Sequence, residues 1–243
     1  MREYERFALI IDSGESALGG VAVRLLNLGV DLLYAADFNE ALLLAAQESQ
    51  RLGAVLMPSS LEVDLVEEVI SRICSKLALG PRALVLAGPE RGREFAERLR
   101  ERGVRWVVCE PYTDRELRFV LTAAMSAGHT GERRKYPRIP TNIEASVFTG
   151  VHRKQVVVHD LSVMGAYLAT PHPFLEDSRI SLEIPLPKGL IRGNAFVANA
   201  QTADEPGRPD VPPGMGVSFN NLSPESYERL QEFVEGWVDR FLL

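Results

Sequence analysis

The chain contains 243 residues, enough for two ordinary domains, and its 46% apolar and 25% charged residues are typical of a soluble globular protein. Its formal net charge of −6 argues against general nucleic-acid binding, which requires a net basic surface. No apolar run approaches the roughly 20 residues that a membrane-spanning helix needs, so we expect no membrane insertion.

The first half of the chain alternates short apolar runs with amphipathic stretches. The apolar runs predict strands at residues 6–11, 31–36, 55–57, 83–87 and 105–109. The stretches between and after them predict helices at residues 19–28, 39–51, 63–79, 91–102 and 114–125, the last of them capped by Thr113 or Asp114. Strand–helix alternation of this length favours an α/β fold with a doubly wound parallel sheet in the flavodoxin-like order.

The pattern changes after residue 125. Residues 126–131 are small and include two glycines, which favours a flexible linker. Beyond Pro140, strands follow one another without helices between them, at about residues 145–149, 154–159, 166–169, 179–184, 194–202 and 214–219. Short strands separated by turns rich in proline and glycine predict a small antiparallel β-barrel.

A helix closes the chain. Ser223 is a suitable N-cap and Pro224 a suitable first helical residue. Apolar residues then recur at spacings of three and four, at Tyr227, Leu230, Phe233, Val234, Trp237 and Phe241. We interpret this stripe as core packed against the mouth of the barrel, and a dimer seam is the alternative.

Few residues suggest covalent or metal chemistry. The two cysteines, Cys74 and Cys109, have neither metal-ligand spacing nor a disulfide framework, which predicts reduced, mostly buried thiols in a cytoplasmic protein. The acid-containing N-terminus does not have the pattern of a signal peptide. The four histidines show no pairing with a nucleophile or a metal set, so we expect no catalytic residues, no metal site and no enzyme activity.

Two short motifs carry the functional information. Residues 132–138 contain four bases and one acid, a net charge of +3 in an acidic chain, and include the pattern RxxxR from Arg134 to Arg138. The pattern DxSxxG follows from Asp160 to Gly165. A local basic cluster on an acidic protein suggests a small anionic ligand; the alternatives are a solvated linker and an ordinary strand-end turn.

Together these motifs resemble the ligand-binding signature of PilZ domains, bacterial receptors for cyclic di-GMP. The resemblance covers about residues 132–240, and both the late strand Gly214–Phe219 and the closing helix fit it. It implies three parts of the chain: an α/β domain at residues 1–127, a linker at 128–137 that carries the start of RxxxR, and a barrel domain with its C-terminal helix at 138–243.

The resemblance also implies roles for the motif residues. Arg134 and Arg138 would bind guanine O6 and N7 or phosphate, on a segment kept extended by the proline before Arg138. Asp160 would accept hydrogen bonds from guanine N1–H and N2–H₂, with Ser162 two residues further along the same strand. Gly165 would permit a turn conformation or a close ligand approach.

Arg133 adds a prediction about stoichiometry. In PilZ proteins, an arginine directly before RxxxR tends to accompany a stacked pair of ligands. The resemblance therefore implies two cyclic di-GMP molecules per domain, with Arg133 contacting the second. We expect no other cofactor.

The first domain resembles bacterial response-regulator receivers in layout but lacks their active-site residues. Asp12 is present where the family has an acidic pair, but Ser13 is its neighbour. Pro58 stands at the phosphoacceptor position, Ala87 replaces the conserved hydroxyl residue, and Glu110 precedes proline where the family has lysine. Phosphoryl transfer needs a nucleophilic carboxylate, a metal and a neutralising cation, so we predict no phosphorelay activity. The resemblance implies instead a module for dimerisation or partner docking.

The leading hypothesis is a non-enzymatic cyclic di-GMP receptor that signals through an unknown protein partner in motility, surface behaviour or development. Homodimerisation through the receiver-like domain or the C-terminal helix is compatible with it. The main alternative is a protein-interaction scaffold that binds no nucleotide. A phosphorylation-driven regulator is disfavoured by the missing acceptor carboxylate.

Overall fold

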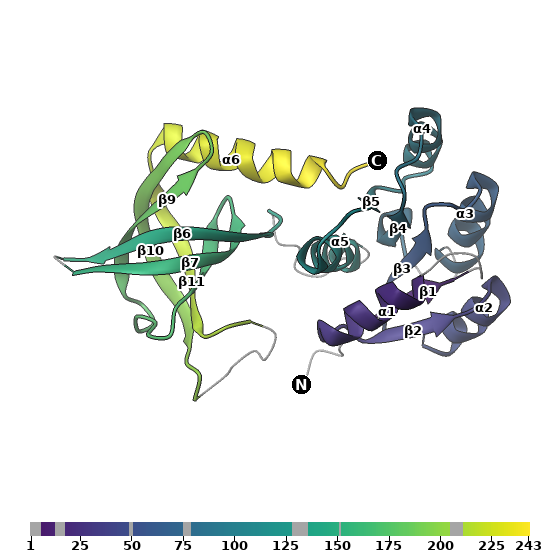
Figure 1. The fold of residues 1–243 in the computed structure, drawn as a ribbon, viewed down its shortest axis with the longest axis horizontal. Coiled ribbons are helices and arrows are strands. Elements are labelled where there is room, and N and C mark those ends of the chain that lie inside the picture. The colour runs from purple at the N-terminus through teal and green to yellow at the C-terminus, as the bar shows by residue number, and fades with distance from the viewer. Residues whose placement is uncertain are drawn as a thin grey trace. The chain divides into compact units, whose positions relative to one another are not determined.

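The computed structural model describes residues 6–12, 18–48, 51–74, 79–127, 136–150, 152–204 and 211–243 (Figure 1). Ser13, Arg133 and Arg134, together with most of the expected linker and the side chain of Cys74, lie outside the described part of the chain. The chain divides into two compact units. Unit 1 comprises Met1–Arg133 together with Phe241–Leu243, and unit 2 comprises Arg134–Arg240.

Unit 1 contains a five-stranded parallel sheet with the order β2-β1-β3-β4-β5. Its strands are β1 Phe7–Ile11, β2 Leu32–Ala35, β3 Leu52–Pro58, β4 Leu84–Gly88 and β5 Trp106–Cys109. Its α-helices are α1 Leu18–Asn27, α2 Phe38–Gln47, α3 Val63–Val69, α4 Arg93–Glu101 and α5 Asp114–Ala127. This is the predicted flavodoxin-like order, which receiver domains also have.

Burial explains why the strands of unit 1 read as unbroken apolar runs. Every residue of β1, β3 and β4 is buried, as expected for strands covered by helices on both faces. The predicted cap of α5 is confirmed: the Glu116 N–H donates to Thr113 Oγ1 over 3.2 Å, and the Thr113 N–H donates to Glu116 Oε2 over 2.9 Å. This reciprocal capping box fixes the start of α5.

The helix predicted at residues 63–79 is wrong at its C-terminal end. The α-helix α3 ends at Val69 and continues as a π-helical turn over Ile70–Cys74. Leu79 is non-helical and buried in the core, and Pro81 begins a short 3-10 turn. The apolar spacing could not reveal this end, because a side chain buried from a loop has the same hydropathy as one buried from a helix.

Unit 2 contains a closed antiparallel barrel in the order β10-β11-β8-β7-β6-β9, with β9 also paired to β10. Its strands are β6 Ile139–Thr149, β7 His152–Ser162, β8 Gly165–Ala169, β9 Arg179–Leu186, β10 Gly189–Gln201 and β11 Gly214–Leu222. The predicted barrel is confirmed, but most strands are longer than predicted. β6 begins at Ile139 rather than near residue 145, because Ile139 and Pro140 already pair with β7.

Helix α6, Pro224–Asp239, packs on the barrel and begins as predicted. Ser223 caps it, and its Oγ accepts a hydrogen bond from the Ser226 N–H over 3.2 Å. The buried residues Leu230, Val234 and Val238 recur every four positions and form its core face. Among the described helices, none is both long and apolar enough to cross a membrane.

The last residue of the predicted apolar stripe does not belong to this helix. Phe241 lies beyond the end of α6, and residues 241–243 belong to unit 1 rather than to the barrel. The sequence analysis assigned these residues to the barrel domain, because Phe241 continues the apolar spacing of the predicted helix.

Candidate functional site

The DxSxxG motif forms a tight hairpin between two barrel strands. Strand β7 ends at Ser162, β8 begins at Gly165, and these two residues are paired in the ladder. The Ser162 hydroxyl is buried and donates to the Gly165 carbonyl oxygen over 3.0 Å. In this structure Ser162 therefore stabilises the turn, and its contact with a ligand stays a prediction.

Gly165 is required by packing between strands. A Cβ built on it would lie 2.2 Å from the Val217 carbonyl oxygen of β11, far closer than real Cβ contacts. Its φ is not among the positive φ values of the chain. The sequence analysis gave a turn conformation or a close ligand approach as reasons for this glycine. The structure shows a close approach of the neighbouring backbone, and a close approach of ligand stays a prediction.

The register between β6 and β7 brings the two motifs together. Ile139 pairs with Leu161, and Pro140 pairs with Asp160. Arg138 directly precedes Ile139, so in an antiparallel ladder its position is alongside the end of β7, where Asp160 and Ser162 are found. Arg138 is exposed. The second arginine of RxxxR and the acid of DxSxxG are thus neighbours on the barrel.

The Asp160 carboxylate has a partner that sequence reasoning missed. The His159 Nδ1 atom lies 3.1 Å from Asp160 Oδ2, and the two side chains are 24% and 28% exposed. A shift of register between β7 and β8 falls between Val158 and Asp160, at His159 itself. The imidazole also stands edge-to-face against Tyr167, with ring centroids 6.1 Å apart. His159 therefore orients the carboxylate while leaving it partly open to solvent.

A second feature that the sequence reasoning missed involves the residue two positions after Arg134. Tyr136 is hydrogen-bonded to Tyr227, which lies in the first turn of α6. This hydrogen bond is the main reason that the pKa of Tyr227 lies above its ordinary value of 10.0. Tyr136, the middle residue of RxxxR, is therefore linked to the first turn of the C-terminal helix.

In unit 1, the residues at the positions of a receiver's active site make hydrogen bonds and strand pairs within the protein. The Tyr34 hydroxyl donates to Asp12 Oδ2 over 2.6 Å, and Asp12 is 6% exposed. Pro58, at the end of β3, pairs with Ala87 of β4. The next residue, Ser59, is buried and donates its hydroxyl to the Pro89 carbonyl oxygen over 2.8 Å. The carboxyl edge of this sheet is thus occupied by hydrogen bonds among the protein's own groups.

No metal cluster accompanies these residues. Within the part of the chain that the structure describes, no group of three or more His, Cys, Asp or Glu side chains could hold a metal ion.

Comparison with protein families identifies the barrel unit. Residues 132–236 match the family model described as PilZ domain. The chain contains a PilZ domain. Among curated proteins, none matches the chain.

Solved structures resemble each half of the chain separately. The PilZ domain of YcgR from Escherichia coli, solved with c-di-GMP, is 19% identical, with 45% of this chain and 94% of that chain covered and a TM-score of 0.35. The Bacillus subtilis inhibitor of motility, MotI/DgrA, is 16% identical over 45% of this chain, with a TM-score of 0.39, and the match spans only 53% of that protein. The Vibrio cholerae chemotaxis protein CheY4 is 21% identical, with 49% of this chain and 98% of that chain covered and a TM-score of 0.41.

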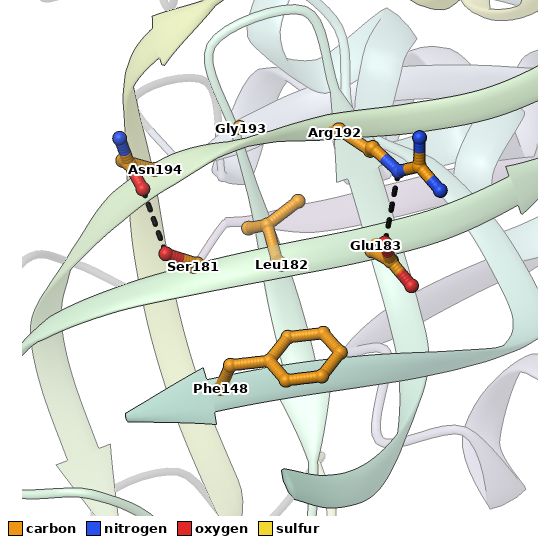
Figure 2. A pocket seen from close by; sticks show the side chains of 7 residues that line it. All are labelled: Phe148, Ser181, Leu182, Glu183, Arg192, Gly193 and Asn194. Atoms are coloured by element: carbon orange, nitrogen blue, oxygen red, sulfur yellow. Dashed lines mark hydrogen bonds and ion pairs between the residues drawn. The ribbon is translucent and has the colours of Figure 1, made fainter. Parts of the chain in front are cut away.

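The PilZ domain also has a shallow hollow that is separate from its motifs. It has a volume of about 440 Å³ and lies over β6, β9 and β10 (Figure 2). The Glu183–Arg192 ion pair, at 2.9 Å, and the Ser181–Asn194 hydrogen bond, at 2.8 Å, flank it. None of its lining residues belongs to RxxxR or DxSxxG, so the motif residues mark a different part of the barrel surface.

Proposed function

We propose that this chain is a non-enzymatic receptor for cyclic di-GMP. The observation that carries the proposal is the β6–β7 register, which sets Arg138 alongside the strand end that bears Asp160. The membership of residues 132–236 in the PilZ family supports the same ligand.

The chemistry of these groups fits a guanine nucleotide with a phosphodiester. A guanidinium donates in a fork that matches both a phosphate and the O6/N7 edge of guanine. A carboxylate accepts from the N1–H and N2–H₂ of the same base. Asp160 is held by His159 at one oxygen, Oδ2, and its remaining acceptor capacity is available to a base.

The remaining predicted contacts complete this proposal. Arg134 joins Arg138 on the ligand, and Arg133 contacts a second, stacked cyclic di-GMP. Holding a residue of a chain in a single backbone conformation costs about 1–2 kcal/mol, so we expect an affinity near the micromolar range.

The receiver-like unit serves as an interaction or dimerisation module that is not phosphorylated. Pro58 offers no acceptor oxygen, and Asp12 and Ser59 are committed to hydrogen bonds with Tyr34 and Pro89. Ligand binding then changes the arrangement of the two units or the access of a protein partner, in signalling that controls motility or surface behaviour.

Calorimetric titration with cyclic di-GMP tests the receptor proposal. Arg134→Ala and Arg138→Ala each remove a charged hydrogen-bonding group, worth about 1.5–3 kcal/mol, so affinity should fall roughly 10- to 100-fold. Arg192→Ala removes an equal charge from the separate hollow of Figure 2 and should bind like the parent. A stoichiometry of two ligands per chain would support the contact of Arg133 with a second ligand. A stoichiometry of one would contradict that contact and leave the receptor proposal standing.

The absence of heat with the parent protein, confirmed by an independent binding assay, would contradict the proposal and favour the nucleotide-independent scaffold. Incubation with acetyl phosphate and Mg²⁺, followed by intact-mass measurement, tests the receiver-like unit separately. A stable mass increase of one phosphoryl group on that unit would contradict its proposed role.

A further inference from the structure

The edge of the sheet in unit 1 is covered by the last residues of the chain. Strand β5 has β4 on one side, and on the other side it meets Phe241–Leu243, here called the tail segment. The Val107 N–H donates to the Phe241 carbonyl oxygen, and the Leu243 N–H donates to the Arg105 carbonyl oxygen, each over 3.0 Å. The tail segment therefore forms an isolated antiparallel bridge, at Leu242 and Trp106, on the edge of a sheet whose strands are all parallel.

Side chains strengthen this pairing. Phe241 is 4% exposed, and its ring centroid lies 5.9 Å from that of Phe119 on α5. Phe119 stands edge-to-face against Trp106, with centroids 6.1 Å apart. Leu243 packs on the core of the unit, and Arg100 Nε of α4 donates to its carbonyl oxygen over 2.6 Å. Backbone, aromatic and charged groups of unit 1 thus converge on three residues.

One feature of strand β5 is unfavourable. The Trp106 indole N–H is buried and lacks a hydrogen-bond partner within the described residues. A buried donor without a partner costs free energy, so this edge strand carries an unfavourable contribution of its own. The tail segment is held by two ladder hydrogen bonds, the buried Phe241 ring, the packing of Leu243 and the hydrogen bond from Arg100. Only three residues at a sheet edge make these contacts, which is typical of a segment that can open locally.

The tail segment follows directly from the helix whose first turn is hydrogen-bonded to Tyr136. Helix α6 ends at Asp239, one residue before Arg240, and its first turn carries Tyr227, the partner of Tyr136. Its buried face runs from Ser226 to Val238, so it is anchored on the barrel along its whole length.

We propose that the edge of β5 is a docking site for an extended aromatic–leucine–leucine segment, and that the chain's own tail segment occupies it. The fraction of time for which the site is occupied changes when ligand binds near the start of α6. The docking site stands on the contacts within unit 1 alone. Its response to ligand rests on the proposed cyclic di-GMP receptor function.

Hydrogen exchange on the full chain tests the docking site. Phe241→Ala should accelerate exchange of the Val107 amide at least about tenfold, while amides of the central strands β1 and β3 stay protected. Leu175→Ala, which removes a side chain that is 82% exposed in unit 2, is the control and should leave Val107 unchanged. Equal exchange at Val107 in parent and Phe241→Ala would overturn the proposal.

A second variant keeps the test decisive if Phe241→Ala loosens the whole unit. A chain that ends at Arg240 should regain protection at Val107 when a synthetic peptide of residues 236–243 is added, and a failure of the peptide to protect would overturn the docking site. Sedimentation of the parent identifies the donor of the segment. A dimer that Phe241→Ala converts to a monomer would show that the occupant comes from a second copy and would overturn its assignment to the same chain.

The response to ligand is tested by the same exchange measurement with cyclic di-GMP at a saturating concentration fixed by calorimetry. Exchange at Val107 should change more than about threefold in the parent and less in Tyr227→Phe, which lacks the tyrosine–tyrosine hydrogen bond. Binding heat without any change at Val107 would overturn the response and leave the receptor function intact. The absence of binding heat would overturn both, while the result for Phe241→Ala would still decide the docking site.

Discussion

Replacement of Gly165 by alanine separates two explanations of the same motif residue. The new Cβ would lie 2.2 Å from the Val217 carbonyl oxygen, whereas real Cβ atoms essentially never come closer than 3.0 Å. Strands β8 and β11 would have to separate by at least 0.8 Å, the difference between these distances. The displaced atoms are backbone on both sides, so no side-chain rotation can relieve the contact.

The expected cost follows from two effects. Overpacking a well-packed interior costs about 1–3 kcal/mol. Separation of the strands also weakens the ladder hydrogen bonds around the Gly165–Ser218 pair, each worth about 0.5–1.5 kcal/mol. We therefore expect the barrel to lose about 2–4 kcal/mol of unfolding free energy. For a domain of this size, that lowers the melting temperature by roughly 8 °C or more.

The assay is thermal and denaturant unfolding of Gly165→Ala, followed by near-ultraviolet circular dichroism and paired with calorimetric titration of cyclic di-GMP. If Gly165 served only a close approach of ligand, affinity would fall while the unfolding free energy stayed that of the parent. That result would refute the packing argument. A loss of stability, with whatever affinity loss follows from a distorted hairpin, would support it.

Three further predictions concern other positions. Asp160→Asn should weaken cyclic di-GMP binding about tenfold or more in calorimetry, because it replaces an acceptor-only group by an amide, and unchanged affinity would contradict the assigned role. Gly236→Ala should raise the unfolding free energy by up to about 1 kcal/mol in denaturant titrations, since Gly236 lies inside α6 with nothing within 4 Å of its added Cβ; a lower value would show a packing constraint that the structure lacks. Burial, and secondarily the Glu90 carboxylate, raise the pKa of the Cys109 thiol above its ordinary value of 9.0. The alkylation rate of Cys109 should therefore reach half its maximum above pH 9.0, and Glu90→Gln should lower the pH of this midpoint.

Much of the fold could be predicted because its signals are local. Strands β1, β3 and β4 are buried on both faces, and their unbroken apolar runs are visible in the sequence. The order of five strand–helix units then leaves few topologies. The end of α3 could not be predicted, because Leu79 is buried from a non-helical segment and matches the helical period by coincidence.

The sequence allowed the residues of the candidate site to be predicted, but not which of them lie close together. Asp160 and Arg138 stood out by their motifs, whereas their proximity depends on the β6–β7 register, a contact between distant residues. His159 was visible as the neighbour of Asp160, yet adjacent residues of a regular strand point to opposite faces, and only the register shift at His159 accounts for their contact. Tyr136 lay inside RxxxR, but nothing in the sequence indicated its partner Tyr227.

The C-terminal helix shows how a correct pattern can still assign a residue to the wrong unit. Phe241 continues the predicted spacing of Leu230, Val234 and Trp237, so its hydropathy predicted one more turn against the barrel. The helix instead ends at Asp239, and the same aromatic ring is buried against Phe119 in unit 1. A helix of this length is about 24 Å long, and its buried face rests on the barrel from Ser226 to Val238, so a displacement of its last turn requires that the barrel strands beneath it also move. The proposed response to ligand therefore needs a rearrangement of the barrel as well as of its C-terminal helix, and the Val107 amide is where that response would be measured.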